Sequence, residues 1–235
     1  MSVLTCMILS GELSSSDITK AIELSDYNKE TIIAGLETNQ LSTRQMLKIL
    51  KGVEERVFQG KDEISQKIVA KISFKGLSWE KKIGMIPEHK HNIPLTRRIV
   101  RSILWKNLSQ KNLEKAVKLS HYNHFVLIAA IETGKLTNQT KFEAIKKVSG
   151  NGKDRPRITD AVIRMNHWGE MSVIDCCVAI TLSGGNRKIA ESVKDHIDFK
   201  KMSLETILKV IELSGRHIVI MDAVGKEMDR RGLRK

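Results

Sequence analysis

The chain has 235 residues, of which 41% are hydrophobic, so it is long and apolar enough to build a core, which argues against disorder throughout. Lysine and arginine number 40 against 27 aspartate and glutamate residues, and the net charge of +13 indicates a polyanionic partner, with nucleic acid the leading class. Most of the excess lies in residues 51–150, whose net charge is +11.

Cysteine usage and the lack of long apolar runs predict a cytoplasmic protein. The three cysteines are Cys6, Cys176 and Cys177, and an odd number with an adjacent pair favours a reducing compartment over a disulfide framework. The sequence has no run of 18 apolar residues, and residues 1–11 lack a basic region before their short apolar run. We therefore expect neither secretion nor a membrane span.

A leucine or methionine followed by serine or threonine recurs along the chain and predicts a helix start at each place. The hydroxyl would accept a hydrogen bond from an unpaired backbone N–H, and the preceding apolar residue would pack on the first turn. An apolar partner stands four residues after five of these caps, whereas Lys82 and Lys141 take that place in the other two. The predicted caps, at intervals of 28, 36, 31, 28, 35 and 31 residues, are Ser14, Ser42, Ser78, Ser109, Thr137, Ser172 and Ser203. Capping boxes are predicted for Ser14 with Asp17, Ser42 with Gln45, and Ser172 with Asp175.

Each cap begins a unit of two helices joined by a turn. In four units the turn follows the cap by 11 residues and reads SDYN, SHYN, SGGN or SGRH, beginning at Ser25, Ser120, Ser183 and Ser214. Apolar residues at helical spacing resume after each turn, and no stretch alternates as a strand does. The three prolines, Pro87, Pro94 and Pro156, are expected at turns between units or at helix starts.

The segment KAIELSDYN at Lys20 returns as KAVKLSHYN at Lys115, 95 positions later. Identities continue beyond this match, for example between Glu37 and Glu132. Such periods are typical of stacked units that cannot bury their apolar faces alone. We therefore predict an all-α fold, a right-handed α-solenoid of about seven two-helix repeats with an internal duplication of ~95 residues. Its expected parts, in one continuous solenoid, are a first triplet of repeats (1–98), a second triplet (99–193), and a closing repeat with a basic C-terminal tail (194–235).

Basic residues at helical spacing predict positively charged stripes on three helices. Like charges on one helical face repel by a few tenths of a kcal/mol per pair, so a stripe favours an anionic ligand. A phosphate track and a solvated face of a lysine-rich chain are both compatible with the pattern. The stripes consist of Lys67, Lys71 and Lys75; of Arg97, Arg98 and Arg101; and of Lys111, Lys115 and Lys118.

Polar residues in the turns predict further phosphate contacts. They would lie at the N-termini of the second helices, where N–H groups and the helix dipole favour an anion. Helix ends and turns also need serine, asparagine and glycine for local reasons, so a purely structural role is the alternative. The residues concerned are Asn28, Lys29, Asn123, His124, Asn186 and Arg187.

The segment MSVIDCCVAITLSGGNRKIAESV, from Met171, resembles one repeat of the transcription-activator-like effector family. The likeness lies in VAI of the first helix, the Gly-Gly turn and the second helix. In that family the turn approaches DNA bases and the second helix begins at a phosphate. The resemblance implies that Ser183 and Gly184 approach bases and that Asn186 and Arg187 contact the backbone, and it favours DNA over RNA.

Other motifs carry less information. HKHN places His89 and His91 two residues apart, and without a CxxC or HExxH companion it favours a turn over a metal site. The tryptophans, Trp79, Trp105 and Trp168, are more typical of helical cores than of base stacking. We predict no metal ion and no other cofactor.

Three functions are compatible with these features. The one we favour is a non-catalytic nucleic-acid-binding protein of helical repeats, with DNA as the favoured ligand, that contacts phosphates through its basic helix faces and its inter-helix turns. The second is a scaffold or inhibitor that binds a partner protein on its concave face. The third is a DNA glycosylase, because the chain resembles small basic glycosylases of HEAT-like repeats in size, charge and helix-pair plan. Its candidate site is Trp168 near Asp160 or Asp175.

Overall fold

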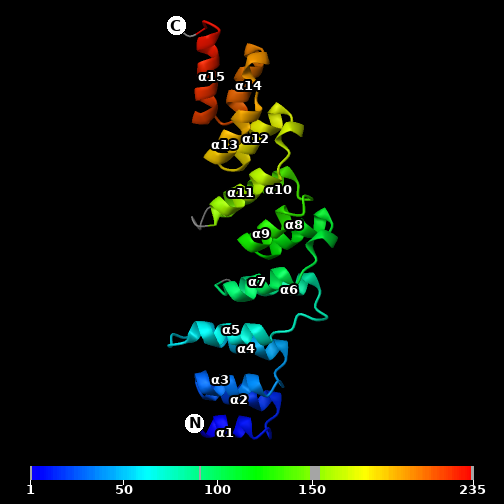
Figure 1. Cartoon of the computed structure of the whole chain (residues 1–235), viewed down its shortest axis with the longest axis vertical. Helices are drawn as coiled ribbons and strands as arrows, with labels where there is room; N and C mark the ends of the chain where they lie inside the picture. The colour runs from blue at the N-terminus through cyan, green and yellow to red at the C-terminus, as the bar shows by residue number, and fades with distance from the viewer. Residues whose placement is uncertain (1, 90, 149–153, 234–235) are drawn as a thin grey trace. The chain divides into compact units, whose positions relative to one another are not determined.

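The computed structural model describes residues 2–89, 91–148 and 154–233, and these ranges contain fifteen α-helices and no β-strand (Figure 1). The prediction of an all-α protein is confirmed. The chain divides into two compact units, Met1–Ile103 and Leu104–Lys235. No helix within the described ranges has the length and apolar character needed to cross a membrane.

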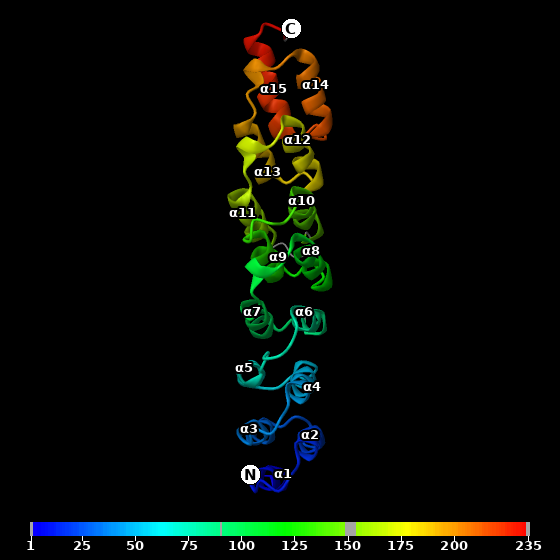
Figure 2. The same cartoon turned by 90° about the vertical axis from the view of Figure 1, so that its right-hand side faces the viewer.

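The first unit arranges its helices in two rows. Contacts join α1 to α3, α3 to α5 and α5 to α7, while α2 contacts α4, and Figure 2 shows the odd-numbered and even-numbered helices on opposite sides of this unit. Consecutive helices also pack as pairs, α2 with α3, α4 with α5 and α6 with α7. The helices are α1 (Val3–Leu9), α2 (Ser15–Leu24), α3 (Lys29–Glu37), α4 (Thr43–Glu54), α5 (Lys61–Lys71), α6 (Trp79–Glu88) and α7 (Ile93–Arg101).

The second unit follows the same plan within itself. Helix α9 contacts α11, α11 contacts α13 and α13 contacts α15, while α10 contacts α12 and α12 contacts α14. Its α-helices are α8 (Gln110–Leu119), α9 (His124–Ile131), α10 (Asn138–Lys147), α11 (Arg155–Met165), α12 (Val173–Leu182), α13 (Arg187–His196), α14 (Leu204–Leu213) and α15 (Ile218–Arg230). Short 3-10 helices are η1 (Trp105–Asn107), η3 (Trp168–Glu170) and η4 (Phe199–Lys201).

All seven predicted N-caps are confirmed. In each one the side-chain oxygen accepts a hydrogen bond from the backbone N–H three residues on, and the helix begins at the next residue. Only Ser42 and Gln45 form the reciprocal capping box, in which Gln45 Oε1 accepts from Ser42 N at 2.9 Å. At the other two predicted boxes the aspartate is shorter and accepts the hydroxyl of the cap instead, as Asp175 does from Ser172 at 2.7 Å.

The turns inside four helix pairs share one backbone geometry. Two consecutive residues adopt positive φ in each, as Asp26 (51°) and Tyr27 (59°) do. The Tyr27 N–H donates to Ile22 O at 3.0 Å, and the preceding Ser25 donates its hydroxyl to the same carbonyl at 2.8 Å, so the last turn of α2 is satisfied. The equivalent positive-φ pairs are His121 with Tyr122, Gly184 with Gly185, and Gly215 with Arg216. The turn chemistry therefore accounts for the repeated nonapeptide.

The two lysines that break the apolar pattern after the caps behave differently. Lys82 donates from Nζ to Ser102 O at 3.0 Å, at the C-terminal end of α7. Lys141 is only 5% exposed, and its burial lowers the pKa of its ammonium group. Pro87 differs from the expectation, because it lies inside α6, whose last turn it occupies, whereas Pro94 and Pro156 lie in the first turns of α7 and α11 as predicted.

Tyr27 folds back onto helix α4. A Cβ atom built on Gly52 would overlap its ring, so only a glycine leaves room for this contact. The Arg56 guanidinium lies over the same ring, with Cζ 4.0 Å from its centroid, and Arg56 also pairs with Asp26 at 2.7 Å. Tyr27 is 9% exposed as a result. This packing fixes the turn between α2 and α3 against the next helix pair.

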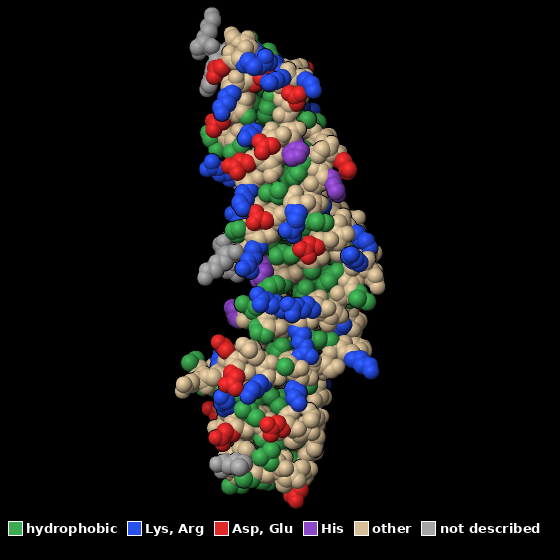
Figure 3. Space-filling model, viewed as in Figure 1, with side chains coloured by type: hydrophobic (Ala, Val, Ile, Leu, Met, Phe, Trp, Pro, Cys, Tyr) green, Lys and Arg blue, Asp and Glu red, His purple; other side chains and the backbone are tan. Residues whose placement is uncertain are grey.

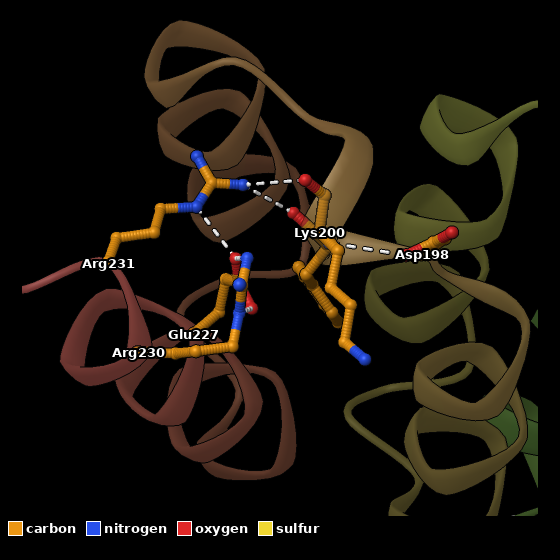
Figure 4. Close-up of polar contacts among 6 residues, drawn as sticks. Asp198, Lys200, Glu227, Arg230 and Arg231 are labelled. Carbon is orange, nitrogen blue, oxygen red and sulfur yellow. Dashed lines mark hydrogen bonds and ion pairs between the residues drawn. The ribbon is translucent and has the colours of Figure 1, made fainter.

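The end of α15 is held against η4 by a cluster of polar contacts (Figure 4). Glu227 accepts from both Arg230 (2.6 Å) and Arg231 (2.7 Å), and these hydrogen bonds lower the pKa of Glu227 to about 2. Arg231 reaches on to the carbonyl oxygens of Phe199 (2.8 Å) and Lys200 (3.2 Å). The basic residues predicted as a tail therefore belong, as far as Arg231, to a folded helix end.

Candidate functional site

Helix α7 carries three arginines, and its packing decides which of them reach the surface. Asn92 caps the helix by accepting from Leu95 N at 2.9 Å, and the Leu95 and Ile99 side chains are buried in the core. With that face turned inward, Arg97 and Arg101 lie exposed, four residues apart on the outer side of the helix. The predicted spacing of these two arginines is confirmed.

Arg98 lies between the two and takes part in packing the unit. It is half-buried, and its Nη1 donates to the backbone oxygen of Val69 in the last turn of α5. Its Cζ also lies 5.8 Å from the centroid of the Phe74 ring. A cation at a helix C-terminus is favoured by the helix dipole, so Arg98 fastens α7 to α5. Arg97 and Arg101 are the two arginines of α7 whose side chains are exposed.

A groove of about 430 Å³ runs between α5 and α7. None of the described residues that line it is acidic, and Lys and Arg side chains cross the surface at the level of α6 and α7 in Figure 3. Positive charge gathered along one wall of a groove raises the local concentration of anions. The lining residues are Gln66, Val69, Ala70, Pro94, Arg97, Arg98 and Arg101.

The predicted stripe of Lys67, Lys71 and Lys75 is wrong in its third member. Helix α5 ends at Lys71, because Ile72 takes an extended backbone conformation, so Lys75 lies beyond the helix. Of the two lysines that remain, Lys67 pairs with Glu63 at 2.9 Å and Lys71 donates to Asn39 Oδ1 at 2.7 Å. These lysines are thus engaged within the unit and do not form one row of three.

The lysines of α8 follow the predicted spacing. Lys111, Lys115 and Lys118 are all exposed on α8, opposite a buried face of the helix. A second groove, of about 460 Å³, lies between α8 and α10, but there Lys118 shares the lining with Glu114 and Glu143. The net positive charge of that groove is therefore smaller than that of the groove beside α7.

The turn residues lie where the sequence places them, at the starts of α3, α9 and α13. Asn28, Asn123 and Asn186 are the N-caps, and each side-chain oxygen accepts from a backbone N–H of its helix. These asparagines use N–H groups that a phosphate would need. Beside them His124 pairs with Asp154 at 3.0 Å and Arg187 with Glu191 at 2.9 Å.

The two residues that the effector resemblance assigns to base contacts differ in exposure. Ser183 is fully buried, and its hydroxyl donates to Ile180 O at 2.9 Å, so its side chain does not reach the surface. Gly184 is exposed and has φ +70°, and a Cβ there would approach Lys146 Cγ to 3.3 Å. Glycine is therefore explained at this position by the turn itself.

A polar network that the sequence did not predict joins α4 to the turn before α7. Glu54 accepts from Asn92 Nδ2 at 2.7 Å and is paired with His89 Nδ1 at 2.9 Å. Burial alone would raise the pKa of Glu54, yet the hydrogen bonds from His89 and Asn92 lower it. Since Asn92 also caps α7, this network helps to position the arginine helix. The only signal in the sequence was the HKHN motif, because the acid lies 35 residues before His89.

The structure also shows the surroundings of the residues considered for a metal site and for a glycosylase site. The described residues contain no group of three or more histidine, cysteine, aspartate or glutamate side chains that could hold a metal ion. Trp168 is buried against Phe142 and His196, with ring centroids 5.7 and 6.2 Å away. Asp160 pairs with Lys188 at 2.7 Å, and Asp175 serves the cap of α12.

Comparisons with protein-family models, with curated proteins and with solved structures find no match to this chain.

Proposed function

We propose that this protein binds nucleic acid without catalysis and contacts the phosphate backbone through the arginines of α7. The observation that carries the proposal is the groove between α5 and α7, where Arg97 and Arg101 are exposed and none of the lining residues that the structure describes is acidic. Guanidinium groups bind phosphate oxygens with two parallel hydrogen bonds, which makes arginine the residue best suited to this contact.

A comparison of α7 with α13 supports a functional origin for this charge. The two helices lie 94 positions apart, both begin after an asparagine cap, and both bury the same three positions. At the places of Arg97 and Arg101, however, α13 has Glu191 and Asp195. A helix of this packing thus tolerates acids at these two positions, so positive charge at Arg97 and Arg101 is not a requirement of the helix packing.

The lysines of α8 extend the proposal to the second unit. In α2, which lies 95 positions earlier, the places of Lys111 and Lys118 are taken by Ser16 and Glu23. The stripe therefore departs from its counterpart toward positive charge, as α7 does from α13. Exposed lysines bind phosphate as point charges and add salt-dependent affinity.

The architecture belongs to the same proposal. We infer a right-handed α-solenoid of about seven two-helix repeats with a duplication of ~95 residues, supported by the seven equivalent caps and the four equivalent turns. Repeated units present equivalent helix faces at intervals, which suits a polymer of regular charge. The cysteine composition supports a cytoplasmic location.

The test is the salt dependence of binding. Duplex DNA, single-stranded DNA and structured RNA are titrated by filter binding at two salt concentrations. If Arg97 and Arg101 each neutralise one phosphate, replacing both with alanine lowers the slope of log affinity against log salt by about two units. The matched control replaces Lys209 and Lys226, which are exposed on α14 and α15, and removes the same charge. It should leave the slope unchanged.

Tight binding that ignores salt, or an equal effect of the control variant, would overturn the proposal. A protein partner is the second candidate, favoured by the exposed leucines of α14, Leu204 and Leu208 (46% and 67%). In that case a captured partner would survive nuclease treatment, and the arginine variant would still capture it.

A further inference from the structure

The groove beside α7 continues into a second hollow of different character. This hollow has a volume of about 450 Å³ and shares Gln66 and Pro94 with the arginine-lined groove, so the two adjoin. It lies between the start of α5 and the turn that joins α6 to α7. Each of the two volumes is in the range of small-ligand sites.

The charge changes sign along this combined groove. Asp62 and Glu88 line the second hollow with exposed carboxylates, while the carboxylate of Glu54, which also lines it, is engaged by His89 and Asn92. Lys61 also lines it, but its ammonium donates to the carbonyl oxygens of Glu54 (2.6 Å) and Arg56 (2.8 Å). A phosphate in this hollow would be repelled by the carboxylates, whereas a group that donates hydrogen bonds would be held by them.

The hollow also offers apolar surface. Pro87, Ile93 and Pro94 line it, and the Ile93 side chain is 49% exposed at its edge. A planar ring could lie on these side chains and direct amino groups at the carboxylates. One nucleotide has the matching parts, an anionic phosphate at one end and a flat base with an exocyclic amine at the other.

We propose that the groove between α5 and α7 takes an unpaired nucleotide of a single-stranded nucleic acid. The phosphate lies at Arg97 and Arg101. The base lies in the hollow, where its exocyclic amine donates a hydrogen bond to the carboxylate of Asp62 or Glu88. This inference rests on the proposed function. A base in a duplex cannot enter, because its ring is stacked between neighbouring bases and its pairing edge faces the opposite strand.

The test compares oligonucleotides of deoxycytidine and deoxyuridine, whose bases differ at two neighbouring positions: cytosine has an exocyclic amine and an unprotonated N3, whereas uracil has a carbonyl and an N3–H. Fluorescence anisotropy should show binding of the cytosine oligomer about three- to tenfold tighter, the effect of one charge-assisted hydrogen bond at a partly exposed site. A hairpin duplex of equal length should bind at least about tenfold more weakly than the single strand.

Two variants separate the base contact from the phosphate contact. The double substitution Asp62→Asn and Glu88→Gln keeps the shape of both side chains and should equalise cytosine and uracil, because an amide can also donate to the uracil carbonyl. Arg97→Ala should weaken both oligomers by the same factor and leave their ratio unchanged. Circular dichroism confirms that each variant folds.

The possible outcomes separate the nucleotide site from salt-dependent binding as a whole. Equal affinities for cytosine and uracil, or a duplex bound as tightly as the single strand, would overturn the nucleotide site while leaving salt-dependent binding intact. A cytosine preference that persists in the double variant would overturn it as well. If no oligonucleotide binds in a salt-dependent way, the proposed function itself fails.

Discussion

Replacing Gly52 by alanine tests the contact between the first turn and helix α4. Gly52 lies within α4 and is buried under the Tyr27 ring, whose Cε1, Cζ and Oη atoms a new Cβ would overlap. The Arg56 guanidinium also lies over the ring, with Cζ 4.0 Å from the centroid. The ring therefore has to move away, and it takes its buried area and the Arg56 contact with it.

Three contributions set the size of the effect. Alanine in place of glycine stabilises a helix interior by about 1 kcal/mol. Overpacking a filled site costs about 1–3 kcal/mol, and loss of the cation–π contact costs about 0.5–1 kcal/mol. Gly52→Ala should therefore lower the free energy of unfolding by about 0.5–3 kcal/mol, the opposite sign to its helix propensity.

Urea denaturation followed by circular dichroism measures this change, and the chain supplies two controls. A Cβ on Gly84, in helix α6, would meet no atom within 4 Å, so Gly84→Ala should stabilise by about 1 kcal/mol. In a Tyr27→Ala background the overlap is gone, and Gly52→Ala should become stabilising too. A Gly52→Ala protein as stable as Gly84→Ala would refute the packing argument.

Three further outcomes follow from buried ionisable groups. The lowered pKa of Glu54 means that its contribution to stability is present above its unfolded pKa of about 4.3 and is lost as pH falls through the folded value, so Glu54→Gln should unfold with a shallower acid dependence below about pH 5. Lys141→Met should raise the free energy of unfolding by about 1 kcal/mol, measured in urea, because it removes a buried ammonium group whose pKa is lowered by burial. Burial raises the pKa of Cys177 to about 12, so a thiol reagent at pH 8 should modify the exposed Cys6 quickly and Cys177 only after unfolding; rapid modification of Cys177 in the folded protein would contradict its burial.

Local chemistry made much of the helix plan predictable. The side chain of a cap such as Ser42 accepts from a backbone N–H three residues away, and a turn such as that at Tyr27 is completed within six residues. Both can therefore be predicted from a short segment of sequence. The prediction that Lys75 continues the stripe of Lys67 and Lys71 was wrong, because residue spacing does not show where a helix ends. Lysines four residues apart are compatible with a helix of any length, whereas α5 ends at Lys71 because the backbone of Ile72 is extended.

The candidate site was only partly predictable. The arginines of α7 were identified from spacing, but their separation into two exposed groups and one structural contact depends on Val69 of another helix. The network of Glu54 with His89 and Asn92 joins residues 35 and 38 positions apart, and no periodic pattern marks such a pair. The hollow beside it is likewise formed by segments distant in sequence.

The sequence by itself determined the all-α class, the seven caps, the turns and the location of the positive charge, because each of these depends on neighbours within one or two helical turns. Only the tertiary structure decided how the charges are engaged, because it joins Lys71 to Asn39, fastens Arg98 to α5 and leaves Arg97 and Arg101 exposed beside a groove. The physical reason is that the partners of a charged side chain can come from segments distant in sequence, as Asn39 does for Lys71 and Val69 for Arg98.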